Sequence, residues 1–274
     1  MFSTGNIQVP RTMEDGSRHY LTMRYRIFRP RQLHMTPPPL VVLHGGPGVP
    51  SNYLVPLVNV ITDRAIILYD QLGSGLSARP ADRCCYSIQL AVTDLHALVT
   101  KAWKIEKFHL YGQSFGGILA FEYLKSYGGC LSVTLSSTTT ETKLAASEID
   151  KMLAENGAAT DKARALEIFR QKHECRVVPM PLPLQDAYAQ ASVIYRGMGA
   201  IRDYKAACST PIACPALVLR GQHDFVTQQC IDGWSDLLSQ SQTVVLGGCS
   251  HHGLLEREQM YGDVILSFLR KHDT

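Results

Sequence analysis

The stretch Tyr111-Gly112-Gln113-Ser114-Phe115-Gly116-Gly117 determines how the rest of this sequence is interpreted. A short apolar run over 108–111 leads into it, and a helical pattern over 115–127 follows. The stretch therefore fits G-x-S-x-G at a sharp turn between a strand and a helix. Side chains at Gly112 and Gly116 would clash where the backbone folds back so tightly. The turn is expected to lift the hydroxyl of Ser114 clear of the sheet, where it could act as a nucleophile.

A serine hydroxyl is a weak nucleophile until a histidine takes its proton and an acid orients that histidine. For this kind of turn the expected chain order is Ser, then Asp or Glu, then His. Asp224 comes shortly after the apolar run 216–219, and the pair His251-His252 comes shortly after the apolar run 243–246. Both places are carboxyl ends of predicted strands, where α/β sheets carry their sites. Asp224 is therefore the candidate acid, and one of the two histidines is the candidate base.

Two backbone amides are candidates for stabilising the oxyanion that forms when the nucleophile attacks a carbonyl. The amide of Phe115 opens the helix after the nucleophile, where the helix dipole favours negative charge. The stretch Leu43-His44-Gly45-Gly46-Pro47-Gly48 follows the apolar run 40–43. Its glycines let a backbone amide approach a substrate oxygen without obstruction, so Gly46 is the second expected donor.

Apolar runs that alternate with helical patterns predict an α/β fold whose mostly parallel sheet has helices on both faces. The predicted strands are 20–28, 40–43, 65–69, 108–111, 131–135, 216–219 and 243–246, and the predicted helices are 87–103, 115–127, 227–238 and 257–269.

The segment 138–209 interrupts this alternation with a long helical pattern that contains no convincing strand. Ala163, Leu166 and Phe169 are expected on one apolar face, and the prolines 179, 181 and 183 are expected to separate two helical pieces. We interpret it as a helical cap inserted before the last two strands. Residues 1–137 and 210–274 would then form the core domain.

Composition excludes several classes of protein. Of 274 residues, 45% are hydrophobic and 19% are charged, which suits a globular core and not a disordered chain. The formal net charge is +3, and no run of like charges suggests a nucleic acid or a membrane surface as partner. No apolar run approaches the roughly 20 residues that cross a bilayer, and charged residues occupy the place of a signal peptide. These features predict a cytoplasmic protein whose partner is a small-molecule substrate, and they leave its oligomeric state open.

The eight cysteines include no C-x-x-C pair, so a zinc site is not expected and the thiols should be reduced. Gly73 and Gly75 could suggest a dinucleotide loop, but the third glycine of G-x-G-x-x-G is missing. We therefore expect no metal and no organic cofactor.

Three segments resemble the α/β-hydrolase superfamily and, more narrowly, its proline iminopeptidase and α-amino-acid amidase branch. They are HGGPG at 44–48, D-Q-x-G-x-G-x-S at 70–77 and G-Q-S-x-G-G at 112–117, and the opening 5–10 is similar to the usual first strand of that branch. The resemblance implies the α/β-hydrolase fold. It also favours His251 over His252, because related hydrolases end in a histidine followed by an apolar stretch and a glutamate, here Glu256.

The chain departs from this branch in the cap. Aminopeptidases of the branch hold the free amino group of the substrate with an Asn-Glu-Phe element, which the corresponding stretch 195–203 lacks. Arg202 would repel an ammonium group. Gly45, Tyr195 and Arg202 are the expected substrate contacts. Phe115 and Leu72 stand where the branch often has tryptophan and arginine, which would reshape the pocket.

The sequence thus predicts a serine hydrolase that acts by acyl transfer on a small amide, peptide or ester. Ser114, His251 and Asp224 would be nucleophile, base and acid, with the amides of Gly46 and Phe115 as oxyanion donors. Thioester and lactone substrates stay open. So does a hydrolase-fold protein that binds or rearranges a small molecule without hydrolysing it.

Overall fold

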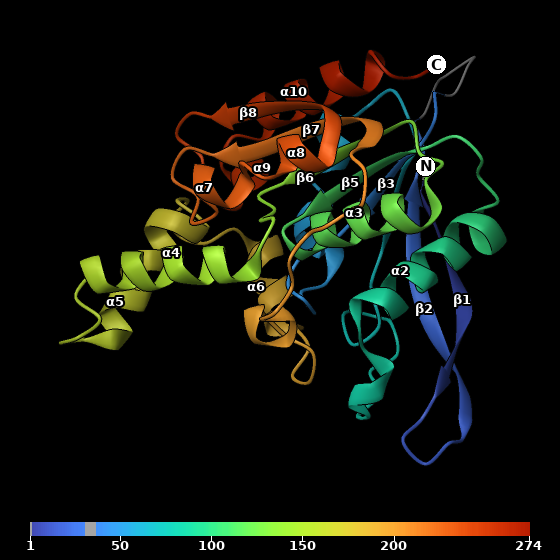
Figure 1. Cartoon of the computed structure of the whole chain (residues 1–274), viewed down its shortest axis with the longest axis horizontal. Coiled ribbons are helices and arrows are strands. Elements are labelled where there is room, and N and C mark those ends of the chain that lie inside the picture. Colours follow the sequence, from blue (N-terminus) through green and yellow to red (C-terminus); the bar gives the residue numbers. More distant parts are fainter. Residues whose placement is uncertain (1, 31–36) are drawn as a thin grey trace.

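The computed structural model describes residues 2–30 and 37–274, and these form one eight-stranded sheet (Figure 1). The strand order is β1-β2-β4-β3-β5-β6-β7-β8, with β3 to β8 parallel and the first two strands antiparallel. The strands are β1 Phe2–Thr12, β2 Arg18–Phe28, β3 Leu40–Leu43, β4 Ile66–Tyr69, β5 His109–Gln113, β6 Ser132–Ser136, β7 Ile212–Gly221 and β8 Leu238–Leu246. The predicted mostly parallel sheet is confirmed.

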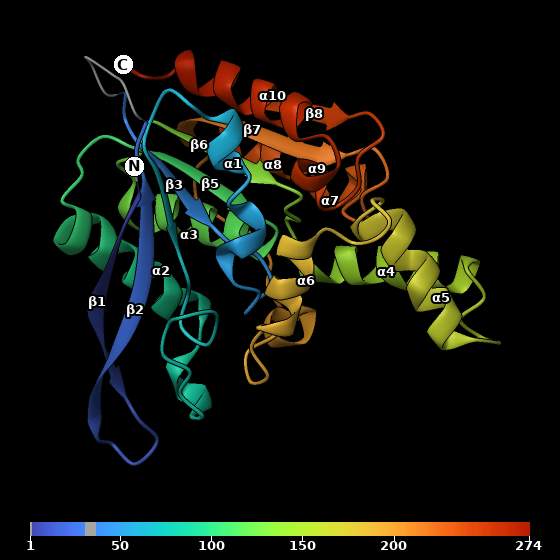
Figure 2. The same cartoon turned by 180° about the vertical axis from the view of Figure 1, so that it is seen from behind.

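Helices cover both faces of the sheet, as predicted (Figures 1 and 2). Successive residues of β3 alternate between two apolar cores, Val41 and Leu43 on one face and Leu40 and Val42 on the other. The helices of the first face are α2 Ile88–Ala97, α3 Phe115–Tyr127, α7 Gln228–Ile231 and α8 Trp234–Leu237, and those of the second are α1 Leu57–Val60, α9 Gly253–Glu256 and α10 Glu258–Arg270. Burial on both faces explains why the central strands read as continuous apolar runs.

The first two strands form a hairpin that extends beyond the rest of the sheet (Figures 1 and 2). Strand β1 lies at the edge, and most of its side chains are exposed or half-buried, so its apolar pattern is weak. The family resemblance, and not hydropathy, pointed to a strand at 5–10. The buried ion pair between Arg11 and Asp94 joins β1 to helix α2.

Between β6 and β7 the described elements are helical, apart from one isolated bridge between Glu141 and Lys205. They are α4 Thr142–Glu155, α5 Lys162–Phe169, a π-helical turn Arg170–Glu174, α6 Leu182–Ala189 and a 3-10 turn Met198–Ile201. Helices α4 and α5 project away from the sheet (Figures 1 and 2). The cap thus lies before the last two strands, while its boundaries as a domain stay a prediction.

The prolines of the cap separate two helical pieces, as expected, but the buried face of α5 consists of other residues than expected. Pro181 caps α6 and Pro183 lies in its first turn, so the cluster separates α6 from the turn Arg170–Glu174. Phe169 is buried, whereas Ala163 is exposed and Ala165 is buried in its place. The buried stripe of α5 is therefore one turn long and follows the i, i+4 spacing of Ala165 and Phe169.

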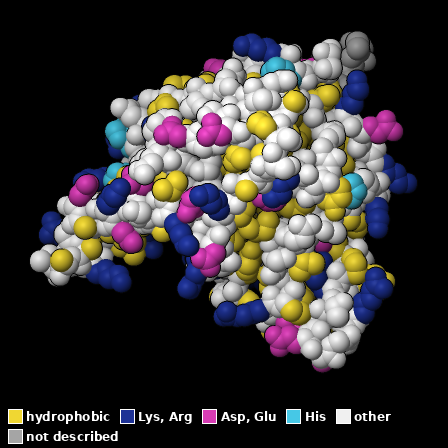
Figure 3. All heavy atoms as spheres, in the orientation of Figure 1, with side chains coloured by type: hydrophobic (Ala, Val, Ile, Leu, Met, Phe, Trp, Pro, Cys, Tyr) yellow, Lys and Arg dark blue, Asp and Glu magenta, His cyan; other side chains and the backbone are white. Residues whose placement is uncertain are grey.

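Each of the eight cysteines is a free thiol in the structure. On the face that Figure 3 shows, basic and acidic side chains are interspersed. The cytoplasmic location and the absence of a nucleic-acid partner stay predictions.

Within the described residues, no helix is both long enough and apolar enough to cross a membrane.

Helix α3 packs so closely on the end of β3 that one position tolerates no side chain. A Cβ on Gly116 would lie 2.1 Å from the carbonyl oxygen of Leu43, which is backbone that cannot move aside cheaply. Gly116→Ala should therefore lower the free energy of unfolding by about 1–3 kcal/mol, the usual cost of overpacking. The measurement is urea denaturation.

Gly247→Ala is the matched control for Gly116→Ala. Nothing lies within 4 Å of a Cβ at Gly247, so this substitution should leave stability within about 0.5 kcal/mol of the wild type. Equal stability of the two variants would contradict the close approach of α3 and β3.

Candidate active site

Ser114 occupies the strained turn that the sequence predicts between β5 and α3. Its φ of 54° and ψ of −117° lie in a region that few non-glycine residues adopt. Its amide donates a hydrogen bond to the carbonyl of Ser136 at 2.8 Å. A Cβ on Gly112 would lie 2.2 Å from the carbonyl oxygen of Gly116, so the crossing of β5 and α3 requires glycine. The turn therefore holds Ser114 at the carboxyl end of the sheet.

Asp224 and His251 meet through a hydrogen bond of 2.9 Å between Oδ1 and Nδ1. The same Asp224 oxygen accepts a hydrogen bond from the amide of Val226. Because Nδ1 faces a carboxylate, we place the ring proton on Nδ1, which leaves Nε2 as an acceptor. The ring of Phe225 stacks on that of His251 with centroids 4.2 Å apart. Packing and hydrogen bonding together fix the orientation of the imidazole.

The loops that carry Asp224 and His251 touch each other. A Cβ on Gly221, at the end of β7, would lie 2.4 Å from the carbonyl oxygen of Ser250. Glu256 accepts hydrogen bonds from both the amide and the hydroxyl of Ser250. The glutamate that the family resemblance marked therefore holds the loop of His251 in place.

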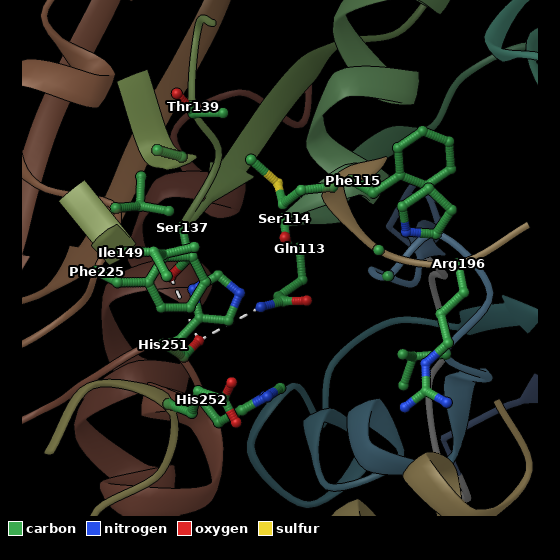
Figure 4. A pocket seen from close by; sticks show the side chains of 18 of the residues that line it. Gln113, Ser114, Phe115, Ser137, Thr139, Ile149, Arg196, Phe225, His251 and His252 are labelled. Carbon is green, nitrogen blue, oxygen red and sulfur yellow. Dashed lines mark hydrogen bonds between the residues drawn. The ribbon is translucent and has the colours of Figure 1, made fainter. Parts of the chain in front are cut away.

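Ser114 and His251 line one cavity of about 450 Å³ beneath the cap (Figure 4). Within the described residues the hydroxyl of Ser114 forms no hydrogen bond, so its contact with His251 is not made in this conformation. The structure thus brings Asp224, His251 and Ser114 to one place. The contact between Asp224 and His251 is formed, and the contact between His251 and Ser114 is not.

The two expected oxyanion donors border the same cavity. Gly46 has a φ of +120°, and a Cβ there would lie 2.5 Å from the amide nitrogen of Gly48, so the loop needs glycine. Phe115 begins α3, and its amide has no partner within the helix. Backbone N–H groups at these two places are suited to an oxygen that carries negative charge.

Residues of the stretch Asp70–Ser77 hold the loop of Gly46. Nε2 of the fully buried His44 accepts a hydrogen bond from the amide of Gln71 at 2.9 Å, so its Nδ1 donates to the carbonyl of Gly45. The side-chain Nε2 of Gln71 donates a hydrogen bond to the carbonyl of His44. Burial lowers the pKa of His44, which keeps it neutral and suited to these contacts.

A chain of hydrogen bonds links the loop of Gly46 to the loop of His251. The amide of Gly45 donates to the hydroxyl of Tyr53 at 2.8 Å, and this hydroxyl donates to Oε1 of Gln113 at 2.7 Å. Nε2 of Gln113 donates in turn to the carbonyl of His251. The sequence analysis missed Tyr53 and Gln113. The only sequence feature that could have indicated this network is that Gln113 directly precedes Ser114. Gly45, one of the expected substrate contacts, is buried and does not line the cavity of Ser114.

Tyr195 and Arg202, the expected substrate contacts of the cap, do not line the cavity of Ser114. Both border a shallower pocket on the surface, and the ring of Tyr195 stacks on Tyr86 with centroids 5.4 Å apart. The cap instead contributes polar side chains that the sequence analysis missed, namely Arg170, Glu174, Tyr188 and Arg196. No sequence pattern pointed to them, because their position depends on how the cap folds over the sheet.

His252 lies in the cavity but lacks an acid partner. Its Nε2 is 3.0 Å from the hydroxyl of Tyr188, and its ring contacts Tyr53 edge-on. Burial lowers the pKa of His252 well below its usual value, and the neighbouring His251 lowers it further. Only His251 of this pair contacts a carboxylate, which agrees with the choice from the sequence.

Within the described residues, no cluster of three or more His, Cys, Asp or Glu side chains could hold a metal ion.

Comparisons with known proteins agree with this architecture. The family model described as alpha/beta hydrolase fold matches residues 38–173. The proline iminopeptidase of Lactobacillus helveticus is 32% identical over 269 residues, which cover 86% of this chain and 91% of that protein. That of Lactobacillus crispatus is also 32% identical, with the same coverage. The chain therefore belongs to the α/β-hydrolase family and, within it, to the group of the proline iminopeptidases.

Solved structures show the same fold. The proline iminopeptidase of Mycobacterium smegmatis superposes with a TM-score of 0.85 at 28% identity, over 97% of this chain and 99% of that one. An esterase from Exiguobacterium antarcticum superposes with a TM-score of 0.71 at 19% identity, over 96% of this chain and 100% of that one. At that identity the esterase supports the fold alone.

The hydroxyl of Tyr53 holds two groups that would otherwise be buried without partners. Tyr53→Phe leaves the amide of Gly45 and the side-chain oxygen of Gln113 unpaired. We expect the free energy of unfolding to fall by about 1–3 kcal/mol. Tyr20→Phe is the control, because Tyr20 is exposed and its loss should change little. Urea denaturation of both variants tests this, and equal stabilities would refute the network.

Proposed function

We propose that this protein is a serine hydrolase that acts by acyl transfer on a small amide, peptide or ester. The observation that carries the proposal is the hydrogen bond between Asp224 and His251 beside the cavity that Ser114 enters. The membership of the chain in the α/β-hydrolase family supports hydrolysis. No resident cofactor enters the proposed reaction.

In the first half of the reaction, Oγ of Ser114 attacks the substrate carbonyl carbon while Nε2 of His251 takes the hydroxyl proton. Asp224 holds the proton of Nδ1 and stabilises the imidazolium that forms. The bond from the carbonyl carbon to the leaving nitrogen or oxygen then breaks. The leaving group takes the proton from Nε2, and an acyl ester on Ser114 remains.

In the second half, water replaces the leaving group. Nε2 of His251 takes a proton from the water as its oxygen attacks the acyl carbon. The ester bond to Ser114 breaks, and the proton returns to its Oγ. The products are the leaving group and a carboxylic acid, which loses its proton to the solvent.

The tetrahedral species of both halves carries a negative oxygen. The amides of Gly46 and Phe115 border the cavity beside Ser114 and would donate to that oxygen. Such donors contribute most when they are already oriented before the reaction. The buried contacts of His44 and Tyr53 with Gly45 would hold the loop of Gly46 in place before the reaction.

The substrate is held in a mostly apolar cavity. Ile118, Ile149, Phe169, Met198 and Val226 are among its lining residues. The named activity of the relatives favours an amide or peptide bond, whereas the missing Asn-Glu-Phe element leaves esters open. Aminoacyl anilides assayed beside acyl esters would separate these leaving groups.

Ser114→Ala removes the proposed nucleophile without removing a described hydrogen bond of its side chain. We expect kcat on any substrate found to fall by at least about 10⁴-fold, with the melting temperature unchanged. Ser235→Ala, a change on the surface, is the control. In parallel, a fluorophosphonate probe should label the wild type at Ser114 and should fail to label the Ala variant. An active Ser114→Ala enzyme would overturn the assignment.

The two adjacent histidines should differ sharply in their effects. His251→Gln removes the base that Asp224 orients, so kcat should fall by at least about 10³-fold. His252→Gln keeps that base and should leave kcat within about tenfold of the wild type. Steady-state kinetics on the best ester or anilide decides between them. If His252→Gln were the more damaging change, His252 and not His251 would be the base.

A further inference from the structure

Two cysteines that are 84 residues apart in the sequence bring their sulfur atoms together at the end of the sheet opposite Ser114. Cys130 lies between α3 and β6, and Cys214 lies near the start of β7. Their Sγ atoms are 4.0 Å apart. Strands β6 and β7 are parallel neighbours (Figure 1), so their amino ends lie on one side of the molecule, whereas Ser114 follows the carboxyl end of β5.

The sheet does not fix the backbone at either cysteine. Cys214 lies in the irregular start of β7, where the register with β8 shifts, and it is not matched with a residue of a neighbouring strand. Cys130 follows Gly128 and Gly129, which both have a positive φ, and nothing lies within 4 Å of a Cβ at Gly128. The two sulfur atoms would need to approach by about 2 Å to reach the length of a disulfide bond. A local shift of this loosely packed loop allows that approach.

The two thiols differ in acidity, because one donates a hydrogen bond to the other. The hydrogen bond from Cys130 lowers the pKa of the Cys214 thiol, although burial acts in the opposite direction. The same contact and burial raise the pKa of Cys130. Since the thiolate is the reactive form of cysteine, Cys214 is the nucleophile of the pair and Cys130 is the thiol that can resolve its oxidised form. Cys130 is half-buried, so a reagent as small as water reaches the pair from its side.

We propose that Cys130 and Cys214 form a site of oxidation, at which hydrogen peroxide joins the two thiols in a reversible disulfide. This inference goes beyond the proposed hydrolase function and does not depend on it. The site is made by two segments that are distant in sequence, a thiol pair within 4.0 Å and a glycine loop beside it.

The reaction takes place in two steps. The thiolate of Cys214 attacks one oxygen of hydrogen peroxide, the O–O bond breaks, and the hydroxide that leaves takes up a proton to become water. Cys214 is then a sulfenic acid. The sulfur of Cys130 attacks the sulfur of Cys214, the S–O bond breaks, and the leaving hydroxide takes the proton of the Cys130 thiol. The two sulfurs have lost two electrons in total, and the peroxide has been reduced to two molecules of water.

The disulfide would close a loop that contains β6 and all the helices between β6 and β7. A crosslink stabilises a protein mainly because it restricts the unfolded chain, and the effect grows with the length of the loop. The oxidised protein should therefore melt about 5–10 °C above the reduced protein.

Mass spectrometry of the full chain tests the site directly. The wild type is treated with hydrogen peroxide, its remaining thiols are blocked with iodoacetamide under denaturing conditions, and it is digested with trypsin. Cys130 lies in the peptide 126–143, and Cys214 lies in the peptide 206–220. We expect these two peptides to be joined, with a mass two hydrogens below their sum, and to separate after treatment with dithiothreitol.

Three serine variants assign the bond. Cys208→Ser is the matched control, because Cys208 lies in the same tryptic peptide as Cys214, and this variant should still form the crosslink. Cys214→Ser and Cys130→Ser should both lose it. Peroxide should raise the melting temperature of the wild type and of Cys208→Ser, and should not raise that of Cys130→Ser. Melting curves of the reduced variants identify any that fails to fold, and the half-buried Cys130 provides the milder of the two substitutions.

Several outcomes would overturn the inference. A crosslink that survives Cys214→Ser and is lost in Cys208→Ser would make Cys208 the partner of Cys130. Recovery of Cys130 and Cys214 in alkylated form, with oxidation only at the exposed Cys84, would show that the pair does not react. Oxidation of Cys214 to a sulfinic acid without any crosslink would show that Cys130 does not reach it.

Discussion

The backbone crossing at Ser114 is the constraint on which this site depends. Strand β5 and helix α3 approach so closely that Gly112 and Gly116 can carry no side chain, and Ser114 takes a strained backbone conformation between them. Such strain persists only where surrounding structure fixes it. Here the buried strand, the packed helix and the hydrogen bond to Ser136 fix it. The proposed nucleophile is therefore oriented by the core of the fold, before any substrate is present.

The close packing of the core also explains why the core could be predicted from the sequence. A strand buried on both faces is mostly apolar, and a close crossing of backbones needs glycine, so both can be recognised in the sequence. Asp224 and His251 come shortly after β7 and β8, and the parallel sheet brings the ends of these two strands together. The edge strand β1 was predictable only by resemblance, since most of its side chains face solvent and show little hydrophobic pattern.

The cap could not be predicted to the same depth, for a physical reason. Which cap side chains face Ser114 depends on how the cap packs over the sheet, and no periodicity records that. Arg202 was expected at the substrate, yet Arg196, six residues earlier in the chain, borders the cavity. Glu174 was invisible because it lies in an irregular π-helical turn. Tyr53 and Gln113 were missed because hydrogen bonds between distant segments have no local sequence pattern.

The cap and the loops that carry Asp224 and His251 are nevertheless joined by hydrogen bonds. The amides of His251 and His252 donate to the carbonyls of His173 and Glu174, so the cap turn is hydrogen-bonded to the loop that carries His251. Nδ1 of His173 also contacts the carbonyl of His223, the residue before Asp224. A cap that moved as a rigid lid would have to break these bonds and disturb His251. The turn Arg170–Glu174 thus connects the cap wall of the cavity to the loop of His251, and a change in the cap sequence near Glu174 would disturb both.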